Sequence, residues 1–243
     1  MKEQVEIVMA TYNGEKYIKE QLLSILPQLS ENDEVIVSDD NSCDKTIDVI
    51  NSLCDKRIKI YTHGKEPYKF LIDKSTHNFA NALKYAKGDI IFLSDQDDKW
   101  VANKVNLMVN QLRSHYIVVS DCYVTDAQLN IIKESYFSIR KKTYGIWDTF
   151  WKSPFLGSCM AFRREVLEAA VPFPKYGVGH DVWLALVSIR KFDLSYIMKP
   201  LSYYRRHKDT VTISGLANNT TFLFKLRYRI FLLKAILFRL YIV

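Results

Sequence analysis

An alternation of short apolar runs and helix-like patterns between residues 5 and 93 constrains the fold more than any other feature of the chain. The apolar runs are typical of buried strands, and the segments between them place apolar residues at helical spacing. The runs are residues 5–10, 34–38, 58–61 and 89–93, and the helical segments are 18–29, 47–53 and 79–86. Such alternation implies a parallel sheet with helices on both faces. We therefore predict an α/β fold with a Rossmann-like, mainly parallel central sheet.

Polar residues cluster directly after the first, second and fourth of these runs. The carboxyl ends of parallel strands lie at one edge of a sheet, so the clusters are expected to converge on one crevice. They are Thr11-Tyr12-Asn13-Gly14, Ser38-Asp39-Asp40-Asn41-Ser42 and Ser94-Asp95-Gln96-Asp97-Asp98. The chain contains no Gly-x-Gly-x-x-Gly and no Gly-Lys-Ser/Thr motif, which argues against a dinucleotide site and a P-loop.

The third cluster places three carboxylates in four positions, at Asp95, Asp97 and Asp98. Acids this close repel one another unless a cation relieves the repulsion. Oxygen ligands suit Mg²⁺ or Mn²⁺, which usually keeps open positions that substrate phosphates can fill. The alternative is a solvated acidic loop that caps a helix beginning near Trp100, because acids favour a helix N-terminus.

The first two clusters suit a sugar nucleotide. Asp39 and Asp40 offer carboxylates for ribose hydroxyls or a base N–H, and Tyr12 offers an aromatic face for stacking. The alternative is that the second cluster is only a polar turn, since Asp, Asn and Ser all favour turns. Asn13 and Gly14 are open to the same turn interpretation.

The ordered set of motifs resembles the family 2 glycosyltransferases of the GT-A fold over roughly residues 4 to 210. Its motif form is most similar to the bacterial rhamnosyltransferase-type branch. Besides the three clusters, the matching pieces are Asn78-Phe79, Gly157-Ser158-Cys159-Met160-Ala161-Phe162, His180-Asp181 and Tyr204-Arg205-Arg206-His207.

The resemblance implies a donor-binding role for several of these residues. We assign nucleotide-sugar binding to Thr11, Tyr12, Asn13, Asp39, Asp40, Asn78, Asp95, Gln96 and Arg205. Arg205 and Arg206 suit diphosphate oxygens, because guanidinium forks match phosphate geometry, although a solvated basic face would look the same.

For the metal, Asp97 is expected to be the direct ligand, and Asp95 to hold the ribose or a metal-bound water. The resemblance suggests His207 as a further ligand or as a diphosphate contact. Two roles stay open for Asp98, which are an acid that supports the metal ligands and a helix cap. The predicted metal set is thus Asp95, Asp97 and His207, holding Mn²⁺ or Mg²⁺.

The reaction also needs a base, because an acceptor hydroxyl is a poor nucleophile near neutral pH. The resemblance places that base at Asp181, which could otherwise simply cap the apolar helix that follows. Many family members carry Glu where this chain has His180, so the role of His180 stays open. Residues 155–160 are expected to form the acceptor-side wall. No second carboxylate is placed as a covalent nucleophile, which favours a single displacement with inversion.

The composition is that of one globular domain. The chain has 243 residues, 48% of them hydrophobic, and shows no linker, repeat or signal peptide. Its four cysteines have neither metal-site nor disulfide-framework spacing, so we expect free thiols in the cytoplasm. We predict a glycosyltransferase domain over residues 1–215 and a basic amphipathic tail over residues 216–243.

Residues 222–243 carry five Lys or Arg and no acid, which accounts for most of the formal charge of +7. These charges interrupt the segment too often for a transmembrane helix. A helix lying on an anionic membrane surface fits better, and the alternative is a helix packed back on the domain. No nucleic-acid motif occurs outside this tail, so nucleic acid is not an expected partner.

These features predict a metal-dependent inverting glycosyltransferase. It would move rhamnose, or alternatively galactose or glucose, from a nucleoside diphosphate sugar to a hydroxyl of a lipid-linked or polysaccharide acceptor. It would work in the cytoplasm, at the inner face of the cell membrane. The alternatives are a nucleotide-sugar-binding protein without catalysis and a nucleotidyltransferase, but the latter would want a Gly-rich basic loop after the first strand.

Overall fold

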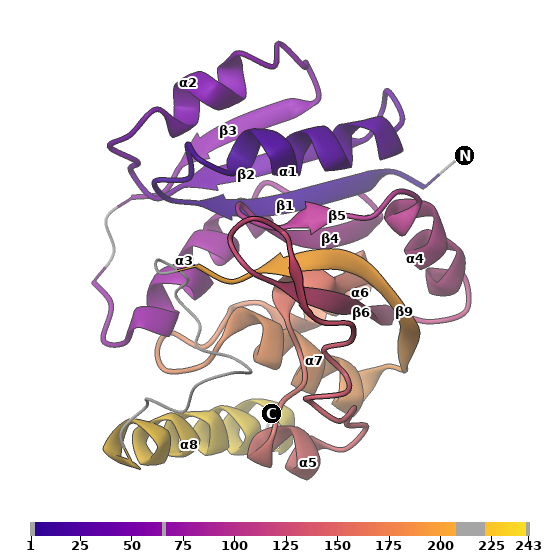
Figure 1. Cartoon of the computed structure of the whole chain (residues 1–243). Coiled ribbons are helices and arrows are strands. Elements are labelled where there is room, and N and C mark those ends of the chain that lie inside the picture. The colour runs from indigo at the N-terminus through magenta and orange to yellow at the C-terminus, as the bar shows by residue number, and fades with distance from the viewer. Residues whose placement is uncertain (1–2, 65–66, 208–221, 242–243) are drawn as a thin grey trace.

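The structure is a computed structural model that describes residues 3–64, 67–207 and 222–241 (Figure 1). Its strands are β1 (Val5–Thr11), β2 (Glu34–Asp39), β3 (Ile58–Thr62), β4 (Ile90–Asp95), β5 (Lys99–Trp100), β6 (Ile117–Thr125), β7 (Ile131–Lys133), β8 (Met160–Arg163) and β9 (Leu194–Arg205). Its α-helices are α1 (Ile18–Ile25), α2 (Thr46–Asn51), α3 (Leu71–Leu83), α4 (Lys104–Leu112), α5 (Ile146–Trp151), α6 (Arg164–Ala170), α7 (His180–Lys191) and α8 (Phe222–Ile236). The predicted alternation up to β4 is confirmed, with α3 beginning earlier than its apolar face indicated.

The strands form one sheet in the order β3-β2-β1-β4-β8-β6-β9-β5, with β7 paired to β6 outside this path. β3, β2, β1 and β4 run parallel. Beyond β4 the sheet is mixed, because β8 runs antiparallel to both β4 and β6 while β6 and β9 run parallel. The parallel half therefore brings the ends of β1, β2, β3 and β4 to one edge, as predicted.

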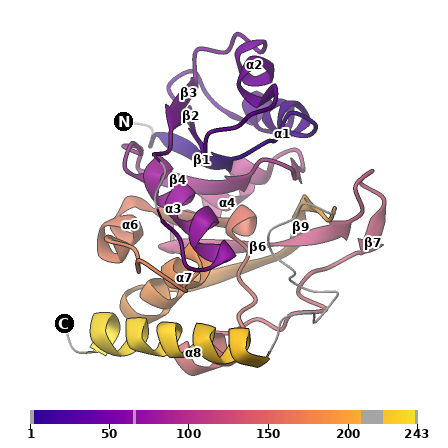
Figure 2. The ribbon, with the colours of Figure 1, turned by 90° about the vertical axis from the view of Figure 1, so that its left-hand side faces the viewer.

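Each face of the sheet has its own apolar core. Ile7 and Phe92 point to the face covered by α1 and α4, where Leu22 and Met108 pack against them. Ile91 points to the opposite face, where the core includes residues of α3, α6, α7 and α8 (Figure 2). Strands covered on both faces need apolar residues at successive positions, which explains the apolar runs in the sequence.

Trp100 does not begin a helix, which corrects the capping alternative for the acidic cluster. It lies in β5, which pairs antiparallel with β9, and α4 begins only at Lys104. The Trp100 ring packs against Phe92, with ring centroids 5.6 Å apart. The chain therefore turns from β4 into a second strand through the acidic cluster.

The C-terminal helix α8 packs on the domain. Leu232 and Ile236 are fully buried in the core, and Arg239 donates a hydrogen bond to the Pro172 carbonyl at 2.9 Å. Apolar side chains also lie on the outer face of α8, which differs from the expected amphipathic pattern. The predicted boundary between residues 215 and 216 lies outside the described residues. Among the helices that the structure describes, none has the length and apolar character needed to span a bilayer.

Candidate active site

The site begins where four parallel strands end. Thr11 pairs with Asp39, and Ala10 pairs with Asp95, so the ends of β1, β2 and β4 lie side by side. Asp39 pairs in turn with Thr62 at the end of β3. The convergence expected from the sequence is therefore present.

A hollow of about 460 Å³ opens beside the ends of β2 and β3. Tyr12 and Asp40 line it as expected, together with Asn41, Cys43, His63, Tyr68, Lys74 and His77. The Asp40 carboxylate lies 3.1 Å from His63 Nδ1 and 3.7 Å from Lys74 Nζ. Lys74 Nζ also lies 4.0 Å from the centroid of the Tyr12 ring, and the Tyr12 side chain is 43% exposed. An aromatic face beside a carboxylate with cationic neighbours can accept a nucleoside.

Sequence reasoning identified only Tyr12 and Asp40 in this hollow. His63 directly follows β3, so the end of the third strand was the available signal. Lys74 lies in α3, where no local pattern indicates a site.

Asp39 and Asn13 take part in the turns beneath the hollow. The Asp39 carboxylate is buried and accepts hydrogen bonds from the Ser42 backbone N–H, at 2.9 Å, and from the Ser42 hydroxyl. Asn13 Oδ1 accepts a hydrogen bond from the Cys43 N–H at 2.8 Å. These contacts are those of the turn alternative, and they hold the loops after β1 and β2 together.

Gln96 joins the loops after β1 and β4. It accepts hydrogen bonds from the Tyr12 N–H, at 2.9 Å, and the Thr11 hydroxyl, and it donates to the Tyr12 carbonyl at 3.0 Å. A Cβ at Gly14 would stand 2.3 Å from Gln96 Oε1, so only glycine permits this approach. Asn78 Nδ2 donates to the Thr11 carbonyl at 3.1 Å. These side chains hold the loop after β1 in place.

The predicted metal residues are brought together in part. Asp97 Oδ2 lies 2.7 Å from His207 Nε2, although the two residues are 110 positions apart in the chain. Asp95 lies near this pair at the end of β4. Within the described parts of the chain, no three His, Cys, Asp or Glu side chains already form a group that could hold an ion.

The charges around Asp95 nevertheless suit a cation. Burial raises the pKa of Asp95 well above its ordinary value, and the nearby Asp98, Asp97 and Asp181 carboxylates raise it further. Carboxylate oxygens with one imidazole are ligands that Mn²⁺ and Mg²⁺ accept. The donor set therefore fits the expected ion, although its ligands are not all in place.

Asp98 and Arg205 fasten β9 to the acidic loop. The buried Asp98 carboxylate accepts a hydrogen bond from the Arg205 backbone N–H at 3.0 Å, so it does not cap α4. Burial and the Asp97 charge raise the pKa of Asp98 to about 7. In return, Arg205 Nε donates to the Asp97 carbonyl at 2.7 Å. This pair of bonds places His207, two residues after Arg205, beside Asp97.

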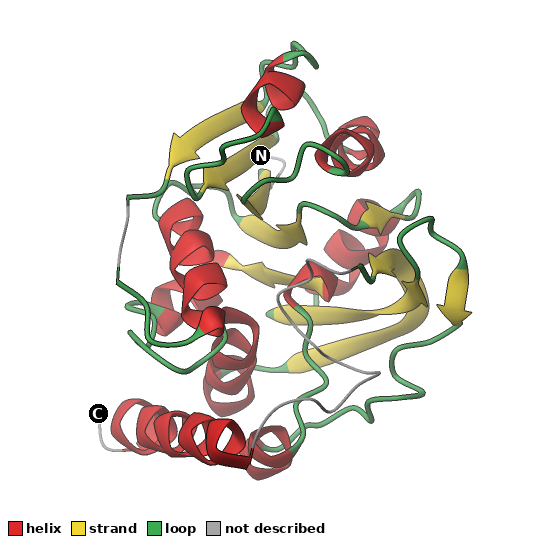
Figure 3. Ribbon diagram, turned by 60° about the vertical axis from the view of Figure 1, so that its left-hand side comes forward, coloured by secondary structure: helices red, strands yellow, loops and turns green. Residues whose placement is uncertain are grey.

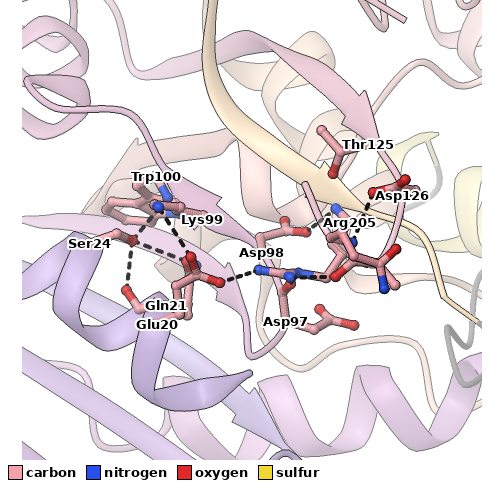
Figure 4. A network of polar contacts seen from close by, with 12 residues as sticks. Glu20, Gln21, Ser24, Asp97, Asp98, Lys99, Trp100, Thr125, Asp126 and Arg205 are labelled. Carbon is pink, nitrogen blue, oxygen red and sulfur yellow. Dashed lines mark hydrogen bonds and ion pairs between the residues drawn. The ribbon is translucent and has the colours of Figure 1, made fainter. Parts of the chain in front are cut away.

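The Arg205 guanidinium, which we expected to suit diphosphate oxygens, is buried and bonded within the protein. Its remaining nitrogens donate to the Ala127 carbonyl at 2.7 Å and to the Glu20 carboxylate at 2.6 Å. Figure 4 shows the side chain reaching from β9 past Asp97 and Asp98 to Glu20 of α1. Its contacts are those of a residue that positions the loop.

Asp181 lies in the first turn of α7, as expected. One of its oxygens accepts a hydrogen bond from the Val182 N–H at 2.7 Å, which is a local, cap-like contact. Burial raises the pKa of Asp181 to about 6. A carboxyl with this pKa is ionised at neutral pH and is more basic than an ordinary aspartate, so it suits proton acceptance.

His180 is buried and uncharged. Its ring stacks on Phe79, with ring centroids 4.0 Å apart, and burial lowers the pKa of His180 to about 3. In the described part of the chain, neither ring nitrogen has a hydrogen-bond partner. A Cβ at Gly157 would stand 2.8 Å from His180 Nε2, so the segment expected to form the acceptor-side wall lies against the first residue of α7, next to Asp181.

Lys104 is a buried cation that the sequence analysis missed. Its ammonium donates to the Ser158 carbonyl at 2.6 Å and lies near the Ser202 hydroxyl, at 3.5 Å. The same ammonium lowers the pKa of Asp98, which shows that the two charges are close. A charged residue inside a predicted helix gave no sign of this burial.

The chain is similar to known glycosyltransferases. A model described as glycosyl transferase family 2 matches residues 6–170. The dTDP-rhamnosyl transferase RfbG of Shigella flexneri is 24% identical over 91% of this chain and 77% of its own. A GalNAc(5)-diNAcBac-PP-undecaprenol beta-1,3-glucosyltransferase of Campylobacter jejuni is 26% identical over 88% of this chain and 69% of its own. The UDP-Glc:alpha-D-GlcNAc-diphosphoundecaprenol beta-1,3-glucosyltransferase WfgD of Escherichia coli is 35% identical, but over only 46% of this chain and 42% of WfgD.

Solved structures confirm the GT-A fold. TarS of S. aureus in complex with UDP-GlcNAc superimposes with a TM-score of 0.67 and 18% identity, over 93% of this chain and 65% of that one. Glucosyl-3-phosphoglycerate synthase of Mycobacterium tuberculosis, solved with Mn²⁺, uridine diphosphate and phosphoglyceric acid, gives a TM-score of 0.60 at 18% identity, over 84% of this chain and 72% of that one.

Proposed function

The chain belongs to glycosyl transferase family 2, and we propose that it is a metal-dependent inverting enzyme acting on a nucleoside diphosphate sugar. One observation carries the proposal. The nucleoside-sized hollow, the Asp97–His207 pair and the Asp181 carboxylate are gathered around the carboxyl edge of one sheet. They supply the three things that sugar transfer needs, which are a donor site, a place for the diphosphate and a base.

The nucleoside occupies the hollow beside Tyr12 and Asp40. Tyr12 offers its ring to the base, and the Asp40 carboxylate accepts a hydrogen bond from the base or ribose. Lys74 and His63, which line the same hollow, contact the Asp40 carboxylate at 3.7 and 3.1 Å. Thr11, Asn78 and Gln96 keep the Tyr12 loop in the position that this binding requires.

Asp97 and His207 would hold the divalent ion, with Asp95 at the ribose or at a metal-bound water. When bound, Mn²⁺ or Mg²⁺ neutralises charge on the departing diphosphate as a Lewis acid. The chain's own contribution is to place a carboxylate and an imidazole side by side. Asp98 and Arg205 maintain that placement through their reciprocal bonds.

Asp181 takes the proton from the acceptor hydroxyl. Its raised pKa of about 6 leaves it ionised at neutral pH while increasing its basicity. The nearby carboxylates Asp95 and Asp97 are assigned to the donor side, so neither serves as the covalent nucleophile that a double displacement needs. Asp181 then acts as the base. A single displacement inverts the anomeric configuration.

Rhamnose from a dTDP donor is the first choice of sugar, and glucose or galactose from UDP is the second. RfbG, named as a dTDP-rhamnosyl transferase, aligns over 91% of this chain, which favours the first. WfgD and the Campylobacter enzyme are named as glucosyltransferases on diphosphoundecaprenol intermediates. Their names support a lipid-linked acceptor here, and hence peripheral work at the inner face of the cell membrane.

The test is a donor panel of dTDP-rhamnose, UDP-glucose, UDP-galactose and UDP-GlcNAc, assayed for binding and for hydrolysis with Mn²⁺, with Mg²⁺ and with EDTA. We expect one donor to bind and to hydrolyse slowly, and hydrolysis to stop with EDTA. Binding without hydrolysis or transfer for every donor would favour the non-catalytic binding protein. Pyrophosphate release from a nucleoside triphosphate and a sugar phosphate would favour the nucleotidyltransferase.

A further inference from the structure

The outer face of α8 is apolar and open to solvent. Leu226 and Ile230, about one helical turn apart, are exposed by 45 and 44%. Phe238, in the π-helical segment Leu237–Tyr241 that follows α8, is exposed by 58%. The inner face of α8 buries Leu232 and Ile236 in the core. Large apolar side chains that stay exposed together on one side of a helix are typical of a surface that meets a partner.

Helix α5 extends this face with two indole rings. Trp151 and Trp147 are exposed by 69 and 50%. The two helices are joined by Arg229 of α8, which donates to the Trp151 carbonyl and lies 5.2 Å from the centroid of the Phe150 ring. α5 and α8 lie side by side at the lower edge of the molecule, as Figures 1 and 3 show. We refer to the exposed residues of these two helices as the α5–α8 face.

Nearly all the charged side chains on the α5–α8 face are cations. Lys225, Arg227 and Lys234 are exposed between the apolar residues of α8, and residues 222–241 contain no acid. Lys152 follows α5, where Asp148 is the single acid. Large apolar side chains, indole rings and cations on one surface match the boundary between lipid headgroups and acyl chains of an anionic bilayer.

We propose that the α5–α8 face is a membrane-docking surface that seats the enzyme on an anionic lipid bilayer. Trp147, Trp151 and the outer leucine, isoleucine and phenylalanine side chains enter the headgroup boundary, while Arg227 and Lys234 bind lipid phosphates. The partner is the lipid surface itself. A second copy of this chain is the less favoured occupant, because two such faces would bring cations against cations.

The α5–α8 face lies close to α7, the helix that carries Asp181. Phe231 of α8 packs against the loop before α7, where a Cβ on Gly177 would stand 2.8 Å from the Phe231 ring. Asp181 also contributes to the raised pKa of Tyr228 on α8, so the carboxylate lies near this helix. Docking through α5 and α8 therefore brings the Asp181 side of the site close to the bilayer. This orientation rests on the proposed function, in which the acceptor is lipid-linked.

The experiment is flotation of the full chain with phosphatidylcholine vesicles that contain or lack phosphatidylglycerol. We expect flotation with the anionic vesicles, weakened by salt, and little with the neutral ones. Trp147→Ser/Trp151→Ser should lower partitioning on the order of tenfold. Arg227→Gln/Lys234→Gln should lower it by roughly fivefold for each charge at low salt.

Matched controls are available on other surfaces. Leu23→Ser on α1 removes an equally exposed apolar side chain, and Lys56→Gln/Lys133→Gln removes two exposed cations elsewhere. Neither control should change partitioning. Leu226→Ser/Ile230→Ser repeats the apolar test without touching α5, in case the tryptophan variant folds poorly.

Tryptophan fluorescence gives an independent readout. Trp100 and Trp183 are buried, so a blue shift on adding anionic vesicles reports Trp147 and Trp151. The proposal is overturned if the chain does not float, if the variants float as well as the controls, or if the face instead mediates a dimer in solution that the variants abolish.

Transfer to a water-soluble acceptor analogue separates this proposal from the proposed function. The face variants should keep that transfer while losing vesicle binding. Vesicle binding without any transfer by the unmodified chain would contradict the proposed function and leave the docking surface standing.

Discussion

The proposed donor side, around Asp97, and the proposed base side, around Asp181, are built in opposite ways. On the donor side, Gln96, Asp98 and Arg205 each make hydrogen bonds to residues far away in the sequence. On the base side, the Asp181 carboxylate accepts its bond from the next residue along the helix. Its neighbour His180 is held by stacking, with no described hydrogen bond to its ring nitrogens.

The difference separates two ways of preparing a carboxylate for chemistry. Asp97 is fixed in position, because the bonds of Arg205 and the contact with His207 determine where it lies. Asp181 is adjusted in basicity, because burial raises its pKa to about 6. A diphosphate with an ion needs accurate placement, whereas proton acceptance needs a suitable pKa.

Replacing the base should have the largest effect. Asp181→Asn keeps the shape of the side chain but removes proton acceptance, so transfer should fall by about two to four orders of magnitude. Donor affinity, measured by calorimetry with Mn²⁺, should stay unchanged, and the melting temperature should not fall. A parallel loss of donor binding and rate would show that Asp181 is only a helix cap.

Replacing the metal ligand should break the donor side instead. Asp97→Asn should lower turnover by roughly two to three orders of magnitude and weaken donor binding, because charge on the diphosphate is no longer neutralised. The fold should survive, since the change removes repulsion among acids. The measurement is donor affinity with and without Mn²⁺, for which the matched control is Asp148→Asn on the exposed surface of α5. Full activity of the unmodified chain in EDTA would contradict the metal-dependent donor side.

The base side should contribute a pH dependence of its own, which the Asp181→Asn variant should lose. Asp181 must be ionised to accept a proton, so the rate should fall about tenfold per pH unit below its pKa of about 6. Above that pH the rate should level off. Single-turnover rates at saturating donor test this, and a plateau that extended down to pH 4 would mean that Asp181 has an ordinary pKa or is not the base.

The smallest effect should come from the rim of the donor hollow. Tyr12→Leu removes the stacking face and the contact with Lys74, which lies 4.0 Å from the ring centroid. The donor KM should rise roughly five- to thirtyfold with little change in kcat, which corresponds to about 1–2 kcal/mol. An unchanged KM would place the nucleoside elsewhere.

Much of the fold followed from local patterns. The strands and helices up to β4 are each specified by apolar residues a few positions apart, and the sheet covers both faces of those strands. Trp100 shows where such reasoning stops. Its strand exists because Ser202 pairs with it across the sheet, and no local pattern reveals a partner so far along the chain.

The residues of the candidate site divide in the same way, into those that a local pattern indicates and those whose role depends on distant partners. Residue types and strand-end positions indicated Tyr12, Asp40 and Asp97, because each follows a strand of the parallel half of the sheet. Asp181 lies in the first turn of α7, and only the family resemblance pointed to it. The structural use of Arg205 and the burial of Lys104 depend on several distant partners at once. A charged residue in a sequence looks the same whether its partners are water or buried carbonyls.

The reciprocal bonds between Arg205 and the acidic loop also concern synthesis of the protein. A ribosome that has made the four parallel strands still has to add more than a hundred residues before Arg205 and His207 emerge. At roughly 5–20 residues per second, that interval lasts on the order of 5–20 seconds. During it, Asp97 lacks its imidazole neighbour, and Asp98 lacks its N–H donor. A nascent or prematurely ended chain therefore contains the acidic loop without the two residues of β9 and its end that position it.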